Sequence, residues 1–167
     1  MPTTIISLED IQIRTYLKPG DIGYVTFLHG DLYSKEFGYG VDFESYVAKG
    51  LGEFAVNFDS KKERVWVCEY KEQIIGFLSL VNSDGAAQLR YFLILPEFRG
   101  IGLGGKLMNL FMEFMQEAGY HTSFLLTTPA LETATKLYQK FGYQLEEELP
   151  SLVFQEPKTL LKYTIEL

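Results

Sequence analysis

The chain of 167 residues predicts an α/β fold with a mixed, mostly antiparallel sheet of six to seven strands and about four flanking helices, in the order βααβββαβαββ. Three observations predict this layout. Residues 64–95 hold three consecutive strand patterns separated only by short polar turns, as in antiparallel neighbours. A glycine-rich loop and an amphipathic segment of helical length then lead to another strand, which a helical crossover would make parallel. Two further helix-length segments precede the first of these strands.

The N-terminal part begins with a strand pattern and a helix. Residues Ile11–Leu17 alternate between apolar and polar side chains, as in a half-buried strand. A Pro-Gly pair then turns the chain, and Asp21 is suited to cap a helix that continues to about Leu32. A loop over residues 33–40 is expected next.

A second helix is expected from Phe43 to about Asn57, because its apolar side chains fall on one face. Asp42 precedes it as a candidate cap. Gly50 and Gly52 lie inside this segment, and each glycine lowers helix stability by about 1 kcal/mol relative to alanine. The pattern therefore predicts a kink or break near these two glycines.

The remaining elements follow from turn residues and from the spacing of apolar side chains. Three strands form consecutive hairpins, and the crossover helix after them leads to a strand parallel to the third. Glycines close both later helices. The expected strands are Arg64–Tyr70, Gln73–Asn82, Ala86–Leu95, Thr122–Thr127, Tyr143–Glu148 and Lys158–Glu166, and the expected helices run from Gly102 to Ala118 and from Ala130 to Phe141.

Residues Arg99–Gly105, RGIGLGG, stand between a buried strand and a helix and are the strongest functional signal in the chain. Glycines let the backbone approach a ligand closely. The N–H groups and the dipole at the start of the following helix favour a phosphate or diphosphate. The loop therefore predicts an anion site.

Spacing separates three kinds of anion loop. Gly100, Gly102 and Gly105 match the dinucleotide fingerprint G-x-G-x-x-G, but four residues separate the first of them from the strand, and no acid ends the next strand. Gly100 to Lys106 also matches most of a P-loop, which requires Ser or Thr where this chain has Leu107. Nucleotide binding by the same glycines stays open as an alternative.

The third kind fits the letters better. Arg99–Gly104, RGIGLG, resembles the R/Q-x-x-G-x-G/A signature of the GNAT N-acetyltransferase superfamily, which follows the fourth strand and holds the diphosphate of acetyl-CoA. Ala134–Tyr143, ATKLYQKFGY, resembles a second family segment, A-x-x-L-Y-x-x-x-G-F/Y. The resemblance covers roughly Ile11 to the C-terminus. It is closest to the acetyltransferase module that some proteins fuse to a MarR-type winged helix, and this chain leaves no room for such a helix.

The resemblance implies acetyl transfer from acetyl-CoA to a primary amine of a small molecule or peptide. It implies a gap between Leu89–Leu95 and Thr122–Thr127 that holds the pantetheine arm, whose amides pair with strand backbone near Leu93 and Ile94. The backbone N–H of Ile94 is then the candidate donor to the thioester oxygen. Tyr138 is implied as the general acid for the departing CoA thiolate, and phenol and thiol pKa values differ by only about 1–2 units.

The residues expected to contact the cofactor lie in the loop, on the strand before it and on two later elements. Leu131 stands where the family often has an Asn in contact with pantetheine, and Thr127 or Thr128 could replace that contact. No metal is expected, because no His, Cys and acid cluster has ligand spacing. The cofactor candidates are Leu93, Ile94, Arg99, Gly100, Ile101, Gly102, Leu103, Gly104, Gly105, Lys106, Thr127 and Lys140.

The sequence does not choose the catalytic base or the acceptor. An amine with a pKa of about 10.4 is mostly protonated at pH 7, so some group must accept its proton. Residues 24–58 are rich in aromatic and acidic side chains, which suits either a cationic acceptor or a core with a solvated acidic face. Cys68, alone on a strand, is expected in the core and not as an acyl carrier. The base candidates are His29, Glu36, Asp42, Glu44 and Glu69.

Composition bounds the other functions. The net charge of −7 argues against a nucleic-acid partner. No apolar run approaches the roughly 20 residues of a membrane span, and a single cysteine fits a reducing cytoplasm. We expect one cytoplasmic domain over residues 1–167 with no membrane partner, and exposed edges of the C-terminal strands would allow a homodimer. The alternative to an enzyme is a non-catalytic acyl-CoA-binding or sensor module.

Overall fold

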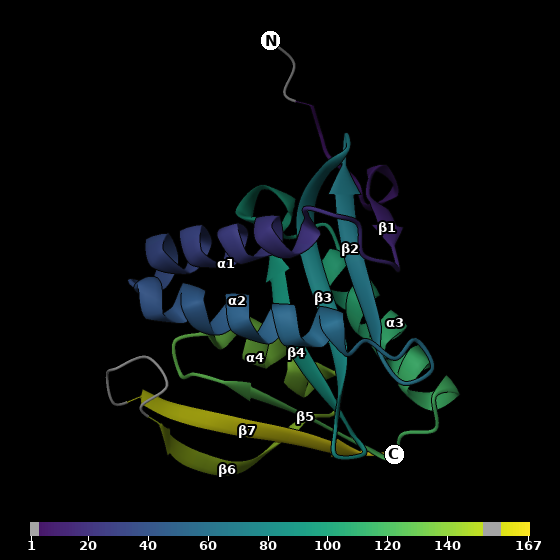
Figure 1. Ribbon diagram of the computed structural model, residues 1–167, viewed down its shortest axis with the longest axis vertical. Helices are drawn as coiled ribbons and strands as arrows, with labels where there is room; N and C mark the ends of the chain where they lie inside the picture. Colours follow the sequence, from purple (N-terminus) through teal and green to yellow (C-terminus); the bar gives the residue numbers. More distant parts are fainter. Residues whose placement is uncertain (1–3, 152–157) are drawn as a thin grey trace.

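The computed structural model describes residues 4–151 and 158–167 and shows a seven-stranded sheet in the order β1-β2-β3-β4-β5-β7-β6 (Figure 1). Every neighbouring pair is antiparallel except β4 and β5, which are parallel. The predicted mixed fold is therefore confirmed. The elements are β1 (Gln12–Arg14), α1 (Asp21–Phe37), α2 (Val41–Val56), β2 (Arg64–Tyr70), β3 (Gln73–Ser83), β4 (Ala86–Ile94), α3 (Leu103–Glu117), β5 (Thr122–Thr127), α4 (Glu132–Lys140), β6 (Gln144–Ser151) and β7 (Lys158–Glu166), with 3₁₀ turns at Leu8–Asp10 and Pro96–Phe98.

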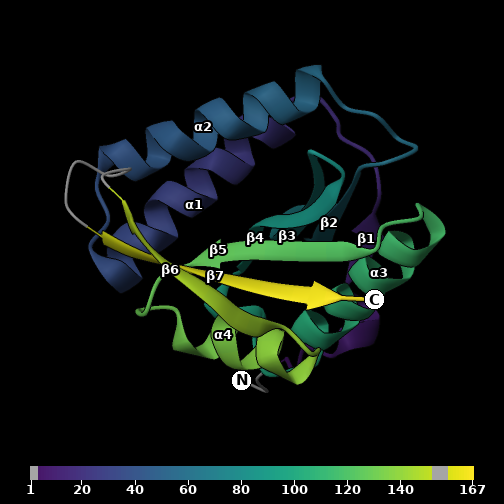
Figure 2. The same cartoon turned by 90° about the horizontal axis from the view of Figure 1, so that it is seen from below.

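Helices cover both faces of the sheet (Figure 2). α1 and α2 lie on one face, and their buried cluster includes Leu51 of α2 with Phe77 of the sheet. α3 and α4 lie on the other face, where Leu107 and Phe111 are fully buried. Because the central strands are covered on both sides, β2 and β3 read as nearly continuous apolar runs and not as alternating patterns. Among the described helices, none is long and apolar enough to cross a membrane.

α1 continues to Phe37, although a loop was expected after about Leu32. The ring of Tyr33 stacks on that of Phe43 in α2, with 4.7 Å between the centroids. Phe37 in turn packs edge-on against Tyr33 at 5.4 Å. Packing between the two helices therefore keeps this segment helical, which its local sequence does not indicate.

α2 runs through Gly50 and Gly52 without interruption, so the predicted kink is wrong. Gly50 faces β4, where a Cβ in its place would clash with the hydroxyl of Tyr91. Burial of Leu51 and Phe54 stabilises the helix, which offsets the cost of about 1 kcal/mol for each glycine. The glycine that weakens the helix thus lets it lie close to the sheet.

Most strand boundaries agree with the sequence, and the differences fall at the edges. β2, β5 and β7 match their predicted ranges. β1 is shorter than Ile11–Leu17, and α4 begins at Glu132 instead of Ala130. β6 extends to Ser151 through Pro150, which is tolerated because β6 is an edge strand without a second neighbour.

β4 and β5 separate soon after they meet. Their parallel pairing ends at Gln88 and Phe124. The register between β3 and β4 then shifts, and Tyr91 has a φ of 58°, so β4 bulges and bends there. The parallel pair and the gap beyond it are both present, as the sequence resemblance implied.

Candidate active site

The gap leads into a cleft of about 540 Å³ between the glycine-rich loop, β4 and α4. Tyr33 and Glu36 of α1 form part of one wall, and residues 130–134, just before and at the start of α4, form part of another. The cleft therefore lies where the sequence placed the cofactor. The cofactor and catalytic candidates that line it are Leu93, Ile94, Arg99, Gly100, Gly102, Leu103, Gly104 and Tyr138.

Four residues of the glycine-rich loop and the first residues of α3 line the cleft with little side-chain bulk: Arg99, Gly100, Gly102 and Gly104, with Leu103 between the last two. Gly100 and Gly102 have φ angles of 80° and 92°, a conformation that costs other residues about 1–2 kcal/mol. Gly102 caps α3, and its carbonyl accepts the N–H of Lys106, so the N–H groups of the first turn lack intrahelical partners. A Cβ at Gly104 would lie 3.1 Å from Leu137 of α4. Free N–H groups at a wall without side chains fit a diphosphate.

The backbone of Ile94 faces the gap. The N–H of Leu95 donates to the carbonyl of Ile75 at 2.9 Å, and paired residues alternate along an antiparallel strand. The N–H and carbonyl of Ile94 therefore point to the other side, where β5 has already separated from β4. An extended ligand in this gap could accept the N–H of Ile94 as an added strand would, whereas the carbonyl of Ile94 already accepts from Nε of Arg99.

Arg99 reaches from the loop toward α1. One terminal nitrogen lies 2.9 Å from Oε1 of Glu36, and its Nε donates to the carbonyl of Ile94 at 2.9 Å. Both charged side chains are partly exposed. The guanidinium thus offsets a carboxylate in the wall of a cleft that is suited to anions.

The other cofactor candidates do not line this cleft. Ile101 and Gly105 belong to the loop but stand outside the lining. Lys106 is exposed and borders a hollow on the α3 side beside Trp66, because the helix rotates it away from Gly104. Lys140 is exposed at the end of α4. Thr127 lines a neighbouring pocket.

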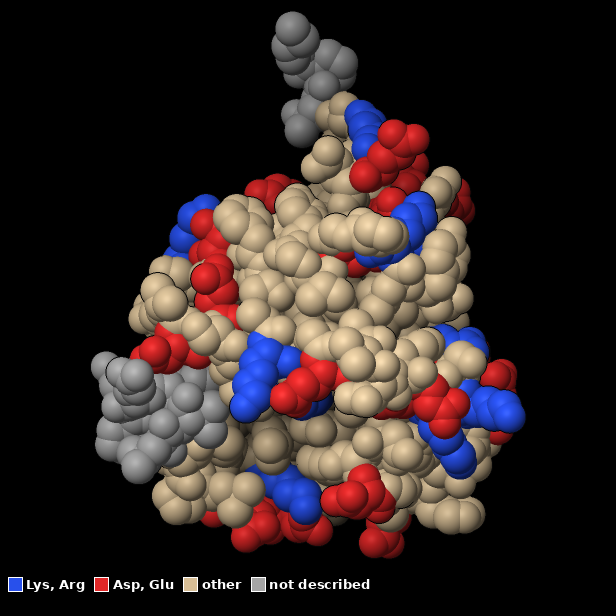
Figure 3. All heavy atoms as spheres, in the orientation of Figure 1, with Lys and Arg blue, Asp and Glu red and all other residues tan. Residues whose placement is uncertain are grey.

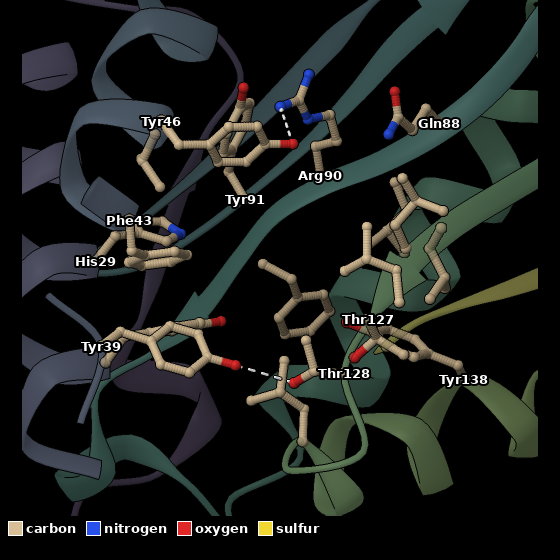
Figure 4. A pocket seen from close by; sticks show the side chains of 18 residues that line it. His29, Tyr39, Phe43, Tyr46, Gln88, Arg90, Tyr91, Thr127, Thr128 and Tyr138 are labelled. Carbon is tan, nitrogen blue, oxygen red and sulfur yellow. Dashed lines mark hydrogen bonds between the residues drawn. The ribbon is translucent and has the colours of Figure 1, made fainter. Parts of the chain in front are cut away.

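That second pocket, of about 140 Å³, lies beside the cleft (Figure 4). Seven of its eighteen lining residues are Phe or Tyr, which come from α1, from α2 and the segment before it, from β4 and from α4. Most of the others are aliphatic or uncharged polar residues, including three from β5. In Figure 4, Tyr46 and Arg90 lie at one end, while Thr127, Thr128 and Tyr138 lie at the other. The residues that line both spaces are Tyr33, Phe92, Leu131 and Tyr138.

Tyr138 therefore stands between the cleft and the pocket. Its side chain is 6% exposed and packs edge-on against Phe92 and Tyr143, each at 6.2 Å between centroids. Burial is the main cause that raises its pKa above the usual value, and nearby Tyr33 adds to the rise. Among the described residues, none is hydrogen-bonded to its hydroxyl. The phenol is thus protonated at neutral pH, as a general acid must be.

His29 lines the second pocket from α1. Its Nδ1 donates to the carbonyl of Val25 at 2.9 Å, which leaves Nε2 as an acceptor on the neutral ring. Nε2 is buried and has no hydrogen-bond partner among the described residues, and Figure 4 shows a ring nitrogen directed toward the interior of the pocket. Burial lowers the pKa of His29 to about 4. The ring is therefore uncharged at pH 7.

The four other base candidates do not line the second pocket. Glu36 lies in the cleft and pairs with Arg99. Glu69 accepts from Arg14 Nε at 2.8 Å, beside the buried pair of Arg14 with Asp21. A Cβ at Gly30 of α1 would clash with the Glu44 carboxylate, so this side chain packs against α1. Asp42 lies in the first turn of α2.

The acidic side chains of residues 24–58 likewise stay outside this pocket. Among its described lining residues there is no Asp or Glu, and Arg90 is the charged member. Figure 3 shows acidic and basic side chains interspersed around a largely uncharged area of the face that α1 and α2 cover. Of the aromatic side chains in the expected acceptor region, Tyr33, Tyr39, Phe43 and Tyr46 line the pocket, whereas its acidic side chains do not.

Arg90 and Tyr91 are site residues that the sequence does not reveal. Regular alternation along β4 would place Tyr91 on the same face as Ala87 and Leu89. The bulge at Tyr91 reverses that alternation, so its ring joins the cluster under α1 and α2 while Leu89 belongs to the other cluster. An Arg followed by a Tyr within a strand does not indicate a β-bulge, so the sequence could not predict that Tyr91 changes face.

Comparison with known proteins agrees with this geometry. Residues 29–143 match the model of the acetyltransferase (GNAT) family. The uncharacterized N-acetyltransferase YjgM of Escherichia coli is 30% identical over 116 residues, which cover 66% of this chain and 70% of that protein. N-acetyltransferase family 8 member 2 of Rattus norvegicus is 26% identical over 62% of this chain, and the match spans only 50% of its own length.

Solved structures share the fold. An acetyltransferase from Streptococcus agalactiae superposes with a TM-score of 0.73 at 18% identity, covering 96% of this chain and 100% of that one. A GNAT family acetyltransferase from Elizabethkingia anophelis with acetyl-CoA bound gives 0.65 at 17% identity, over 95% and 99%. A variant of the spermidine N-acetyltransferase SpeG from Vibrio cholerae gives 0.67 at 19% identity, over 95% and 94%.

Proposed function

We propose that this chain, which belongs to the acetyltransferase (GNAT) family, transfers an acetyl group from acetyl-CoA to a primary amine of a small molecule or peptide. The observation that carries the proposal is the position of Tyr138, a buried and protonated phenol that lines both the cleft and the second pocket. Acetyl-CoA is the donor in this family and supplies the activated acetyl group. The cleft is the proposed donor site and the second pocket the proposed acceptor site.

The donor site would be held mainly by backbone. The N–H groups from Arg99 to Gly105 would hold the diphosphate, and the backbone near Leu93 and Ile94 would pair with the pantetheine arm. The N–H of Ile94 would stabilise negative charge on the thioester oxygen, a contribution that reaches about 10²–10³ in rate when such a donor is well placed. Support comes from the cleft lining and from the direction in which the Ile94 backbone faces.

Tyr138 would act as the general acid. Its hydroxyl holds a proton because burial raises its pKa, and it would give that proton to the sulfur that leaves with CoA. Burial makes this phenol a weaker acid than an exposed one. The same apolar surroundings also disfavour an unprotonated thiolate, so the proton would pass to the sulfur as negative charge develops there, and the proton that the amine loses on forming the amide would restore the phenol. Its place on the wall shared by both spaces supports this role.

His29 would hold the attacking amine. A ring with a pKa of about 4 binds a proton weakly, so we assign it the hydrogen bond and not storage of the proton. Its unpartnered Nε2 can accept an N–H from the amine, which orients the nitrogen lone pair away from His29. An aromatic, desolvated pocket also favours the neutral amine over the ammonium ion.

Four further expectations stay proposals. We treat residues 1–167 as one acetyltransferase domain. The closer resemblance to the module fused to MarR-type winged helices also stays a prediction, because none of the relatives named above is described as a winged-helix protein. A cytoplasmic location and a homodimer are expected on the same footing.

Thiol release tests the proposal. Purified protein is mixed with acetyl-CoA and a panel of primary amines, and free CoA thiol is followed over time. We expect release that depends on both the protein and an amine. Tight binding of CoA by calorimetry with no release from any amine would favour a non-catalytic acyl-CoA-binding module. Tight binding of ATP or NAD without CoA binding would overturn the proposal altogether.

A further inference from the structure

We propose that the acceptor is a small amine that also carries a carboxylate, and that Arg90 binds this carboxylate at the end of the second pocket opposite Tyr138. The inference rests on the proposed function, because it names the class of amine that the acceptor site takes. It is carried by the charge, the shape and the polar groups of the pocket.

The charge of the pocket favours an anion. No Asp or Glu occurs among the described residues that line it, whereas Arg90 does. Glu53 of α2 is near enough to influence Tyr91 electrostatically, but it is exposed and does not line the pocket. An acceptor with a second positive charge would therefore meet Arg90 without a compensating carboxylate. An acceptor with a negative charge would form an ion pair in a partly desolvated site.

The guanidinium of Arg90 is held in place by neighbouring side chains and still has N–H donors that could bind a ligand. One terminal nitrogen donates to the hydroxyl of Tyr46 at 3.0 Å. Its central carbon lies 4.6 Å from the ring centroid of Tyr91 and 5.5 Å from that of Tyr46. Among the described residues, no carboxylate forms an ion pair with Arg90. A guanidinium offers five N–H donors, so several remain for a planar carboxylate.

The backbone that carries Arg90 is also fixed. Ser79 of β3 is fully buried, and its hydroxyl donates to the carbonyl of Arg90 at 2.8 Å. This bond lies at the edge of the bulge, where regular pairing with β3 is lost. The side chain of Arg90 thus projects from a defined point on β4 and not from a loop.

The opposite end of the pocket suits an amine. There Oγ1 of Thr127 is buried and, like Nε2 of His29 in the side wall, has no hydrogen-bond partner among the described residues. A hydroxyl and a neutral imidazole nitrogen can accept N–H bonds, which a neutral amine supplies. The pocket, at about 140 Å³, is smaller than the roughly 300–1,000 Å³ of sites for drug-sized ligands. An amino acid or a compound of similar size fits this space.

Matched substrates and matched variants test the inference. The panel pairs glycine, β-alanine, phenylalanine and γ-aminobutyrate with their carboxamides, and it includes a polyamine. The variant Arg90→Gln removes the charge. The control Arg64→Gln removes an arginine from β2 that likewise packs on an aromatic ring, Phe114 at 4.2 Å, but lines a hollow outside both the cleft and the pocket.

We expect at least one amino carboxylate to exceed its carboxamide in kcat/KM by about 10–100-fold, the range of one charge-assisted contact. Arg90→Gln should bring the two to within about threefold, mainly through KM, while the KM for acetyl-CoA stays unchanged. Arg64→Gln should keep the preference. The same amino carboxylate should raise the thermal midpoint of the CoA-bound wild type and of Arg64→Gln but not of Arg90→Gln.

Two results would overturn the inference. The first is that carboxamides or the polyamine support thiol release at least as well as carboxylates do, and that Arg90→Gln does not change this. That result would refute the inference but leave the proposed function standing. The second result is that no amine, in this panel or in a broader one, causes thiol release, and that no amino carboxylate shifts the thermal midpoint. That result would refute the proposed function together with the inference.

Discussion

The cleft and the second pocket are built in different ways. The cleft is built around one continuous stretch of backbone, β4 and the glycine-rich loop, and residues of α1 and of the segment 130–138 complete its walls. The second pocket is formed by side chains from α1, α2, β4, β5 and α4, which come together only in the folded chain. A backbone site leaves a short and readable signature in the sequence, whereas a side-chain site distributes its residues among elements that are far apart. Tyr138 belongs to both.

Replacing Tyr138, one of the residues that line both spaces, should have the largest effect. Tyr138→Phe keeps the ring and its packing on Phe92 but removes the proton donor, so we expect kcat to fall by about 10²-fold or more. The KM for acetyl-CoA should change little. Steady-state thiol release measures both constants. Tyr163→Phe, a buried tyrosine of β7 outside both spaces, serves as the control. An unchanged kcat in Tyr138→Phe would remove the general-acid role.

The buried His29 in the proposed acceptor site should make the stability of the protein depend on pH. The pKa of His29 is about 4 in the folded chain and 6.5 when exposed, so the unfolded chain binds more protons between these values. The part of the unfolding free energy that depends on an uncharged His29 is therefore fully present above pH 6.5. It is lost as the pH falls toward 4, by about 2 kcal/mol between pH 7 and pH 5. His29→Gln should lack this loss in denaturant unfolding, and His121→Gln, at an exposed site, should retain it. Parallel curves for all three proteins would contradict a buried, uncharged His29.

The cofactor side should be sensitive to a single methyl group on its backbone. Gly100→Ala and Gly20→Ala both place a side chain at positive φ in open space, so each should cost about 1 kcal/mol of unfolding free energy. Only Gly100→Ala should also raise the KM for acetyl-CoA, by about tenfold, because only Gly100 lines the cleft. Equal KM values in the two variants would mean that the loop does not hold the donor.

The smallest expected effect concerns the carboxylate of Glu36. It lines a cleft proposed to take a polyanion, so Glu36→Gln should lower the KM for acetyl-CoA about two- to threefold, with little change in stability because the ion pair with Arg99 is partly exposed. Asp31→Asn on the same helix, where Asp31 pairs with Lys35, controls for general charge effects. A rise in KM for Glu36→Gln would show instead that the pair positions Arg99 for binding.

The same contrast explains how much could be predicted from the sequence. The fold, most strands and the lining of the cleft by Gly100, Gly102 and Gly104 followed from turn residues and from one motif. Lys106 and Lys140 were expected near the anion because of their charge and place in the sequence, but neither lines the cleft, and Lys106 borders a different hollow beside α3.

What could not be predicted depends on contacts between distant elements. The continuation of α1 to Phe37 depends on stacking of Tyr33 against α2, and the continuity of α2 depends on contact of Gly50 with β4. The bulge that turns Tyr91 toward α2 has no local signature, so the place of Arg90 in the pocket was hidden as well.

Backbone amide shifts on titration with CoA test most directly whether the cleft is the donor site. If the cleft holds CoA, the largest shifts will fall on Leu93, Ile94 and the loop from Arg99 to Gly105, with little change at Arg64 and Trp66, which line the hollow beside α3. Large shifts confined to the second pocket or to other surfaces, with the loop amides unmoved, would contradict it.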